Sequence, residues 1–218
     1  KFNEAELLYP QSAWASKSIL MAAYAFYSQN YYDRSILELE RFISKYPKHK
    51  NIDYAYFILA MNYYETIVDE KKDLEPLLLS KEKFEYIIQN FPETDFAQDS
   101  KYKLGLIQDV LASKEMHIGK YYLKRKKWVA AINRFKTVIS DYETTVYVEE
   151  ALHRLVETYY KIGLVEEAEK YASVLGYNYQ SSKWYEATYI IFNKEYKTSL
   201  ATKKDKRSVL KKFKNIFK

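Results

Sequence analysis

The feature that most constrains the fold is an aromatic residue, followed by proline in three of five cases, that returns along the whole chain. The five pairs are Tyr9-Pro10, Tyr46-Pro47, Phe91-Pro92, Tyr142-Glu143 and Tyr179-Gln180. They lie 37, 45, 51 and 37 residues apart, and a period of roughly 20–50 residues is typical of repeat proteins. Because proline cannot continue a helix, we expect each pair to end one, with a looser turn at Tyr142-Glu143. The sequence therefore predicts a repeated helical unit.

In the segment before the stops, one position carries a small residue and another carries an apolar residue. A small residue lies twelve positions before the second member of the last four pairs, at Ser35, Ser80, Ala131 and Ala168. An apolar residue lies five positions before the second member of every pair, at Ala5, Phe42, Ile87, Val138 and Leu175. A small side chain lets two helices approach closely, and the apolar one packs between them. This order is typical of the second helix of a tetratricopeptide-type hairpin.

Two further positions recur after four of the stops. A hydroxyl side chain follows the second member by two residues, at Ser12, Thr94, Thr145 and Ser182. An aromatic side chain follows it by four, at Trp14, Phe96, Tyr147 and Trp184. A hydroxyl at this place can accept a hydrogen bond from a free amide of the first helical turn. We therefore expect these hydroxyls to cap the first helix of the next repeat, and the aromatic rings to pack on the preceding helix pair.

Composition supports an all-helical chain. Only four glycines and four prolines occur in 218 residues, so tight hairpin turns are scarce while helix-forming residues are abundant. We expect an all-α, tetratricopeptide-like solenoid of helical hairpins over residues 1–199, with about five repeats and the first one truncated. A long loop is expected at 65–79, with Pro76 near the start of the next helix. The first helix of the third repeat should be extended towards residues 120–128.

The last segment, residues 200–218, is expected to be a separate basic tail. Residues 201–218 carry eight Lys or Arg against Asp205, a net charge of +7, so the rest of the chain carries −1 of the total +6. Apolar residues recur in it at helical spacing, at Val209, Leu210, Phe213, Ile216 and Phe217. Three interpretations stay open: the tail caps the last repeat or contacts a partner, it lies on an anionic membrane, or it is solvated.

Catalytic and cofactor signatures are missing from the sequence. There is no cysteine, which excludes disulfides and thiolate metal sites. His49, His117 and His153 do not show metal-ligand spacing, and the four glycines are isolated rather than arranged in a phosphate-binding loop. No stretch approaches the roughly 18 apolar residues of a membrane span. We expect no enzyme, no cofactor and no metal ion.

The densest basic and aromatic segment of the repeat region is residues 120–135. Aromatic and cationic side chains together can bind nucleic acid. Helical periodicity favours another interpretation, in which Trp128, Ala131, Ile132 and Phe135 form a core stripe and Tyr121, Tyr122, Arg125 and Arg134 lie on its margins. Tyr, Trp and Arg are also the residues that anchor protein interfaces. The segment, with the 24 tyrosines of the chain, therefore indicates protein binding more than nucleic-acid binding.

Three stretches carry a more specific signal: LLYPQSAWA (7–15), RFISKYPKHKNIDYAYF (41–57) and LASKEMHIGKYYLKRKKWVAAINRF (111–135). The second stretch shows Tyr-Pro followed by His and then by Ile-Asp-Tyr. The third shows Tyr-Tyr, Arg, Trp-Val-Ala and Asn-Arg in this order. This arrangement resembles the BamD family, lipoproteins of the bacterial β-barrel assembly machinery. The resemblance spans roughly residues 1–184, includes the inserted loop of the second repeat, and leaves out the lysine-rich tail.

The resemblance implies a scaffold of five tetratricopeptide-like repeats at the periplasmic face of the outer membrane. A lipid on an N-terminal cysteine would anchor the full-length protein, and that cysteine and the first helix of repeat one would lie before Lys1. The C-terminal repeats would bind the POTRA region of BamA, and the N-terminal repeats would receive the targeting signal of unfolded outer-membrane proteins. Other lipoproteins of the assembly complex are further candidate partners.

The resemblance also implies candidate site residues. On the BamA side they are Tyr121, Tyr122, Arg125, Asn133 and Arg134, with Arg134 the candidate for a salt bridge to an acid of BamA. In the substrate-peptide groove they are Tyr24, Tyr54 and Tyr63. We expect a non-catalytic scaffold with these two sites and no nucleic-acid partner. The alternatives are a general tetratricopeptide adaptor and a nucleic-acid-binding repeat protein.

Overall fold

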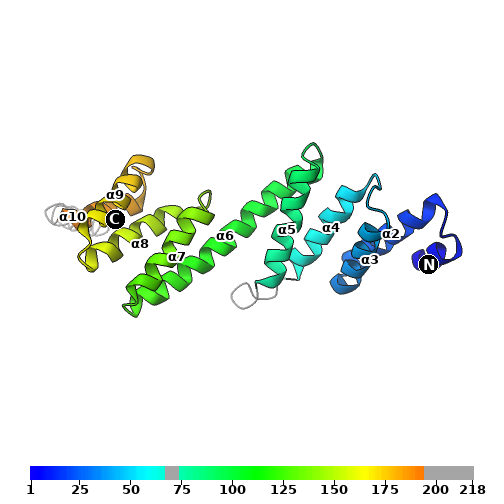
Figure 1. Ribbon diagram of the computed structural model, residues 1–218, viewed down its shortest axis with the longest axis horizontal. Coiled ribbons are helices and arrows are strands. Elements are labelled where there is room, and N and C mark those ends of the chain that lie inside the picture. Colours follow the sequence, from blue (N-terminus) through cyan, green and yellow to red (C-terminus); the bar gives the residue numbers. More distant parts are fainter. Residues whose placement is uncertain (67–73, 194–218) are drawn as a thin grey trace, which may run out of the picture. The chain divides into compact units, whose positions relative to one another are not determined.

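The computed structural model describes residues 1–66 and 74–193, and all regular structure in these ranges is α-helical (Figure 1). The ten helices of this described part are α1 (Phe2–Leu8), α2 (Ala13–Ser28), α3 (Tyr32–Lys45), α4 (Ile52–Glu65), α5 (Glu75–Asn90), α6 (Asp95–Lys124), α7 (Trp128–Asp141), α8 (Val148–Lys161), α9 (Val165–Asn178) and α10 (Lys183–Phe192). The expected all-α class is confirmed, as an array of tetratricopeptide-like helical hairpins.

The chain divides into two compact units, and helix α6 begins in the first and ends in the second. In the first unit, Lys1–Val110, α1 packs on α2, α2 on α3, α3 on α4 and α4 on α5. Its core joins α2, α3 and α4 through Ile19, Leu20, Ala23, Leu39, Phe42, Ile52, Ala55, Ile58 and Leu59. Helices α2, α3 and α4 each pack on more than one neighbour, as in repeat proteins whose single units cannot bury their apolar faces alone.

In the second unit, which starts at Leu111, α7 packs on α8, α8 on α9, and α10 on both α8 and α9. Its core includes Ala112, Met116, Ala131, Ile132, Phe135, Val138, Ala151, Leu155, Val156, Tyr159 and Ala168. Helix α6 contacts α7 closely at Gly119, where an added Cβ would meet the ring of Phe135. The predicted core stripe of α7 is confirmed at Ala131, Ile132 and Phe135, whereas Trp128 is only partly buried.

The small residues of the repeat lie where helices approach most closely. The side chains at all four positions are inaccessible to solvent. In the first unit, the Ser35 hydroxyl donates to the carbonyl oxygen of Ala23 at 2.9 Å, and Ser80 donates to that of Ala60 at 3.0 Å. Each serine therefore joins the second helix of its hairpin to the first, and the hydrogen bond offsets the cost of burying a hydroxyl.

Each stop makes the same turn, with or without proline. The stop residue donates its amide to the carbonyl oxygen four positions earlier, at 2.8 Å from Tyr46 to Phe42 and at 3.3 Å from Tyr142 to Val138. Its own carbonyl accepts the amide three positions later. The backbone angles are φ −130° and ψ 55° at Tyr46, and φ −132° and ψ 41° at Tyr142. Backbone groups that every residue supplies therefore close the turn without proline, and the longer amide bond at Tyr142 agrees with the looser turn expected there.

The predicted helix caps are confirmed at three positions and wrong at one. Ser12 and Ser182 accept the amide two residues later at 3.2 and 3.1 Å, and Thr94 accepts the amide three residues later at 3.3 Å. Thr145 caps no helix, because α8 begins only at Val148. Its hydroxyl donates instead to the carbonyl oxygen of the stop residue, at 2.8 Å. Thr94 makes the same bond to the carbonyl oxygen of Phe91, at 2.9 Å, so this bond supports the turn with or without a following proline.

The recurrent aromatic residues pack on the preceding helices except at the first stop. Phe96 lies 5.2 Å from the ring of Phe57 in α4, and Trp184 lies 5.2 Å from the ring of His153 in α8. Trp14 is 70% exposed, so its predicted packing is wrong. The ammonium nitrogen of Lys17 lies 4.7 Å from the centroid of the Trp14 ring instead.

The insertion of the second repeat is shorter than expected. Helix α5 begins at Glu75, with Pro76 in its first turn. The placement of Pro76 is confirmed, but the loop predicted for 65–79 is wrong at its end, because Leu77 is 1% exposed within α5. The extended first helix of the third repeat is confirmed by the 30 residues of α6.

The predictions for the C-terminal end fall partly outside the described residues. The repeat pattern also predicts the first helix of the fifth repeat at about 182–197, and the structure has this helix over Lys183–Phe192, as α10. The remainder of that segment and the tail at 200–218 lie outside the described residues. The division between repeats and tail therefore stays a prediction.

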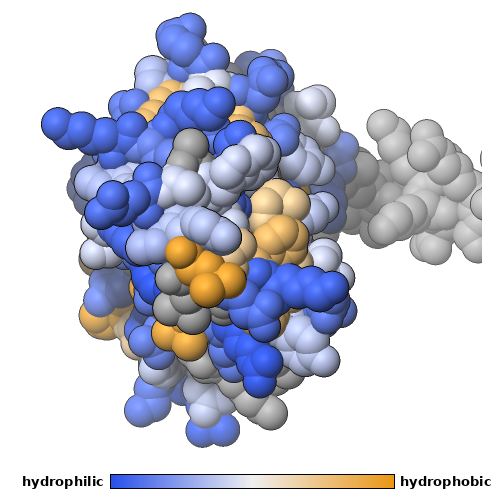
Figure 2. Space-filling view, turned by 90° about the vertical axis from the view of Figure 1, so that its right-hand side faces the viewer, coloured by the Kyte–Doolittle hydropathy of each residue, from blue (hydrophilic) through white to orange (hydrophobic). Residues whose placement is uncertain are grey.

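The surface of the first unit mixes charged side chains with isolated apolar ones. Leu8 is 71% exposed, Leu37 is 66% exposed and Met21 is 48% exposed. Figure 2 faces the end that carries α1 and shows hydrophobic groups separated by hydrophilic ones rather than one continuous apolar face. Single exposed apolar residues are normal on protein surfaces, so this end does not by itself indicate a docking site.

Candidate protein-binding surfaces

The first candidate surface lies at the turn between α6 and α7. The guanidinium of Arg125 lies 4.5 Å from the ring centroid of Tyr121, whose ring meets that of Tyr122 edge-on at 5.7 Å. The turn is closed by the amide of Lys127, which donates to the carbonyl oxygen of Tyr122 at 3.0 Å. Lys126 occupies the left-handed region at φ 59°. The turn thus presents a stacked aromatic and cationic group, which suits an interface anchor.

Arg134 lies farther along the same helix pair and is already in an ion pair. Its Nη1 donates to both carboxylate oxygens of Glu115 in α6, at 3.0 and 3.2 Å. The Arg134 side chain is 43% exposed, whereas that of Glu115 is 17% exposed. Burial, and after it the charge of Glu115, raises the pKa of Tyr142 nearby. The pair therefore ties α7 to α6 and keeps part of a guanidinium at the surface.

The structure arranges the five predicted BamA-side residues in two groups. Tyr121, Tyr122 and Arg125 come together at the end of α6, and Asn133 and Arg134 lie on α7. Asn133 is exposed, and Tyr122 packs against the core of the second unit.

Sequence reasoning missed Glu115 as a member of this surface. A usable signal was present, because Glu115 precedes the turn residue Arg125 by ten positions and Arg134 follows it by nine. Residues equally distant from a turn face one another in a pair of antiparallel helices.

The second candidate surface joins the first helices of successive repeats in the first unit. The ring of Tyr54 in α4 lies 5.5 Å from that of Phe96 in α6. Burial raises the pKa of Tyr54, and the neighbouring phenols of Tyr24 and Tyr27 raise it further. Tyr24, in α2, is 44% exposed. Tyr24 and Tyr54 therefore belong to one aromatic surface. Tyr27 and Phe96 belong to it too, and sequence reasoning missed both.

Tyr63 lies away from this surface. It follows Tyr54 by nine residues in α4, which at 3.6 residues per turn is about half a turn around the helix and about 13 Å along it. Its hydroxyl donates to Glu40 in α3 at 3.2 Å. Burial, followed by the charge of Glu40, raises the pKa of Tyr63 to about 12. The structure thus brings together two of the three predicted groove residues and separates the third.

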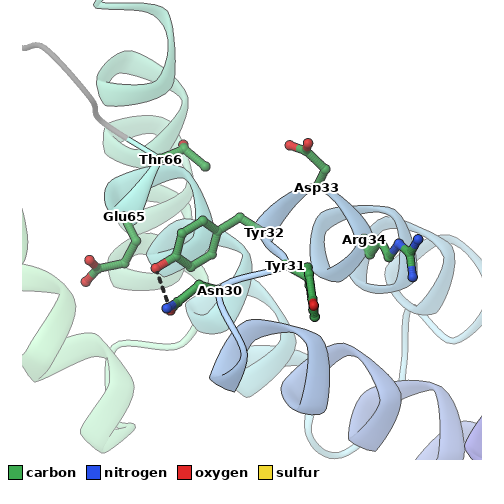
Figure 3. A pocket seen from close by; sticks show the side chains of 7 residues that line it. All are labelled: Asn30, Tyr31, Tyr32, Asp33, Arg34, Glu65 and Thr66. Carbon is green, nitrogen blue, oxygen red and sulfur yellow. Dashed lines mark hydrogen bonds between the residues drawn. The ribbon is translucent and has the colours of Figure 1, made fainter.

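A pocket of about 380 Å³ lies where the turn between α2 and α3 meets the end of α4 (Figure 3). It is lined by Asn30, Tyr31, Tyr32, Asp33, Arg34, Glu65 and Thr66. The Tyr32 hydroxyl donates to Asn30 Oδ1 at 3.0 Å, and the Arg34 guanidinium lies 5.9 Å from the ring of Tyr31. None of the predicted site residues lines it. These seven residues include no pair of nucleophile and general base, so the pocket does not indicate catalysis.

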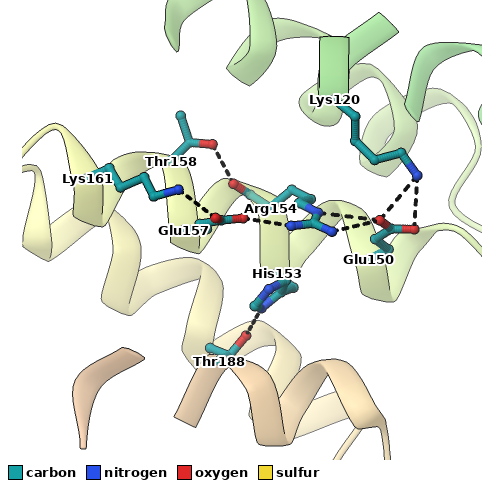
Figure 4. A network of polar contacts seen from close by, with 8 residues as sticks. All are labelled: Lys120, Glu150, His153, Arg154, Glu157, Thr158, Lys161 and Thr188. Atoms are coloured by element: carbon teal, nitrogen blue, oxygen red, sulfur yellow. Dashed lines mark hydrogen bonds and ion pairs between the residues drawn. The ribbon is translucent and has the colours of Figure 1, made fainter. Parts of the chain in front are cut away.

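A polar network joins three helices of the second unit (Figure 4). Glu150 in α8 accepts Lys120 from α6 at 3.3 Å and pairs with Arg154, which also pairs with Glu157 at 2.8 Å. On the other side of α8, His153 Nδ1 lies 2.8 Å from the hydroxyl of Thr188 in α10. The network therefore holds α6 and α10 against α8.

The described ranges show neither a metal-binding cluster nor a membrane-spanning helix. Among residues 1–66 and 74–193, no cluster of three His, Asp or Glu side chains is placed to hold a metal ion. The helices of these ranges are too short or too polar for any of them to cross a bilayer.

Comparison with known proteins identifies the family. A family model described as YfiO, outer membrane lipoprotein, matches residues 1–175. The chain belongs to this family. The YfiO match confirms the localisation expected from the resemblance, and it agrees with a non-catalytic protein.

Curated relatives of this YfiO family chain carry the name outer membrane protein assembly factor BamD. The protein from Rickettsia prowazekii is 44% identical over 189 residues, which cover 87% of this chain and 75% of that protein. The one from Caulobacter vibrioides is 42% identical over 192 residues, covering 88% and 63% respectively. The one from Neisseria meningitidis serogroup A is 30% identical over 187 residues, covering 81% and 70%. The resemblance to BamD is thereby confirmed over most of the chain.

Proposed function

We propose that this chain is a non-catalytic scaffold for the assembly of outer-membrane β-barrel proteins. In this role it binds the POTRA region of BamA through the second unit and the targeting signal of unfolded outer-membrane proteins through the first. Its relatives are named as assembly factors, and a helical-hairpin array offers extended surfaces for peptides and domains. Other lipoproteins of the complex are further candidate partners.

The proposed binding of BamA is supported by the surface that α6 and α7 present. It presents Arg125 stacked on Tyr121 and a half-exposed guanidinium at Arg134. Arg and Tyr are the residues on which interface energy concentrates, and guanidinium groups form directional pairs with carboxylates. An acidic patch on the POTRA region is the complementary partner.

Calorimetric titration of the chain with the POTRA domains of BamA from the same organism tests this proposal. We expect saturable binding that Arg134→Glu weakens at least tenfold, since reversing the charge turns attraction into repulsion. Lys170→Glu is the matched control, because it reverses an exposed cation that pairs with Glu167 on α9 of the same unit. Absence of binding by the folded parent chain would reject the BamA assignment and favour a general adaptor. Loss of affinity in both variants would instead indicate a non-specific charge effect.

For the substrate side, we propose that the targeting peptide lies along the aromatic surface of Tyr24 and Tyr54. Aromatic residues recognise extended peptides through large contact areas with little loss of side-chain freedom. Tyr63 is kept as a third candidate, although its hydroxyl is engaged by Glu40 on another side of α4.

Fluorescence anisotropy with a labelled C-terminal peptide of an outer-membrane β-barrel protein tests this side. Tyr24→Ala should weaken binding by about 5- to 30-fold, the range for an interface anchor of 1–2 kcal/mol. Tyr102→Ala, which removes a 69% exposed tyrosine from α6, should bind as the parent does, and Tyr63→Ala decides the place of the third candidate. Equal affinity of the parent and Tyr24→Ala would exclude this surface.

A further inference from the structure

The hydrogen bonds of Arg134 engage only one side of its guanidinium. In the part of the chain that the structure describes, Nη1 makes both contacts with Glu115, whereas Nε and Nη2 make no hydrogen bond or ion pair. Nε and Nη2 together form one of the two edges through which a guanidinium binds a carboxylate by two parallel hydrogen bonds, and it is the edge that does not use Nη1. The internal ion pair therefore leaves this bidentate edge of Arg134 unengaged.

Glu115 is the fixed member of the pair. Its side chain is 17% exposed against 43% for Arg134, and it lies within the long helix α6, nine residues before the end of that helix. An arginine side chain free in solvent samples many rotamers, and immobilising it on binding costs affinity. A guanidinium held through Nη1 has lost that freedom before a partner arrives.

We infer that Glu115 is a positioning residue for the partner site: it orients Arg134 so that Nε and Nη2 receive a carboxylate of the bound domain. This inference rests on the proposed binding of the POTRA region. Glu115 itself needs no contact with the partner, and its role is to pre-organise the arginine.

The opposite role for Glu115 would be that of an internal competitor, which the partner's carboxylate displaces. The geometry argues against displacement. A competitor would occupy the edge formed by Nε and Nη2, whereas Glu115 uses Nη1 alone. Displacing it would also leave a largely buried carboxylate without its cation, which is costly. The two roles predict opposite effects of neutralising Glu115.

Calorimetric titration of Glu115→Gln with the POTRA domains tests the inference. The amide is nearly isosteric with the carboxylate, so the helical circular dichroism should be retained. We expect binding weaker by about 3- to 10-fold, which corresponds to the ordering of one rotamer-rich side chain. Glu157→Gln is the matched control, because it removes a carboxylate that pairs with Arg154 in the same unit.

A double-mutant cycle separates positioning from a general structural effect. In an Arg134→Ala background, Glu115→Gln should cause no further loss of affinity, since the residue to be positioned is gone. An equal loss in that background would mean that Glu115 acts by another route, and the inference would be overturned. Parent-like or tighter binding by Glu115→Gln alone would overturn it too, while the parent's own binding would leave the partner assignment intact. Absence of binding by the parent would reject the partner and the role of Glu115 together.

Discussion

Replacing Gly119 with alanine should destabilise the second unit, because the new methyl group has no room. A Cβ at this position would lie 2.5 Å from Cε1 of Phe135 and 2.9 Å from Cδ1 and Cζ. Carbon atoms in ordinary contact are roughly 3.5–4.0 Å apart. Phe135 is inaccessible to solvent and belongs to the core of the unit, so its ring cannot move without disturbing other buried side chains.

The change in the free energy of unfolding is the difference between the cost of overpacking the core and the gain in helix propensity. Overpacking a core costs about 1–3 kcal/mol, and alanine gains about 1 kcal/mol over glycine in a helix. We therefore expect Gly119→Ala to lower the free energy of unfolding by up to about 2 kcal/mol. At about 2–4 °C per kcal/mol for a chain of this size, the melting temperature should fall by several degrees.

Gly105 supplies a matched control within the same helix. An added Cβ there has no atom within 4 Å, so Gly105→Ala should raise stability by about 0.5–1 kcal/mol through helix propensity alone. Urea titration followed by circular dichroism at 222 nm measures both variants. If Gly119→Ala were as stable as Gly105→Ala, the close approach of α6 and α7 at Phe135 would be refuted.

Two other predictions concern buried titratable side chains, His153 and Glu6. Burial, and after it the charge of Arg154, lowers the pKa of His153 from 6.5 to about 4. The unfolded chain therefore binds more protons than the folded chain between these pH values, and the free energy of unfolding should fall by about 3 kcal/mol as the pH drops through this window. Thermal unfolding at pH 7.5 and pH 4.5 measures the fall, and a His153→Gln variant that kept all of it would contradict this assignment. Glu6 is 4% exposed and pairs with Arg41 and Lys45, each at 2.9 Å, so Glu6→Gln should cost about 2–3 kcal/mol. Urea unfolding compares it with Glu82→Gln, an exposed carboxylate paired with Lys83, and equal midpoints would show that the Glu6 pairs contribute nothing.

Much of the fold could be predicted because each repeat depends on residue types at fixed positions within a short segment of the sequence. Small residues, apolar residues and stops recur at constant offsets, and the structure buries Ser35 and Phe42 where the pattern predicts. The exception at Thr145 has a physical cause. A hydroxyl near a turn can bond to a following amide, to a preceding carbonyl or, as at Thr94, to both. Because α8 begins only at Val148, Thr145 keeps the bond to the carbonyl alone.

The candidate sites were harder to predict because they depend on how helices face one another. Periodicity places Tyr54 and Tyr63 in one helix, but only the structure shows Tyr54 beside Phe96 and Tyr63 beside Glu40. The pairing of Glu115 with Arg134 likewise depends on the register of two helices around a turn. Residue type and spacing predict which side chains are suited to binding, whereas their grouping into surfaces requires the packed structure.

The turn at the stops affects how the sequence of such a chain can evolve. Tyr46, with proline after it, and Tyr142, without, adopt the same turn through the same backbone hydrogen bonds. A proline at that place then acts mainly on the unfolded chain, whose freedom it restricts. Substitutions at these prolines would lower stability by small steps without altering the architecture. A lineage could therefore gain or lose them one repeat at a time, and adjust the stability of each repeat separately while its binding surfaces stay in place.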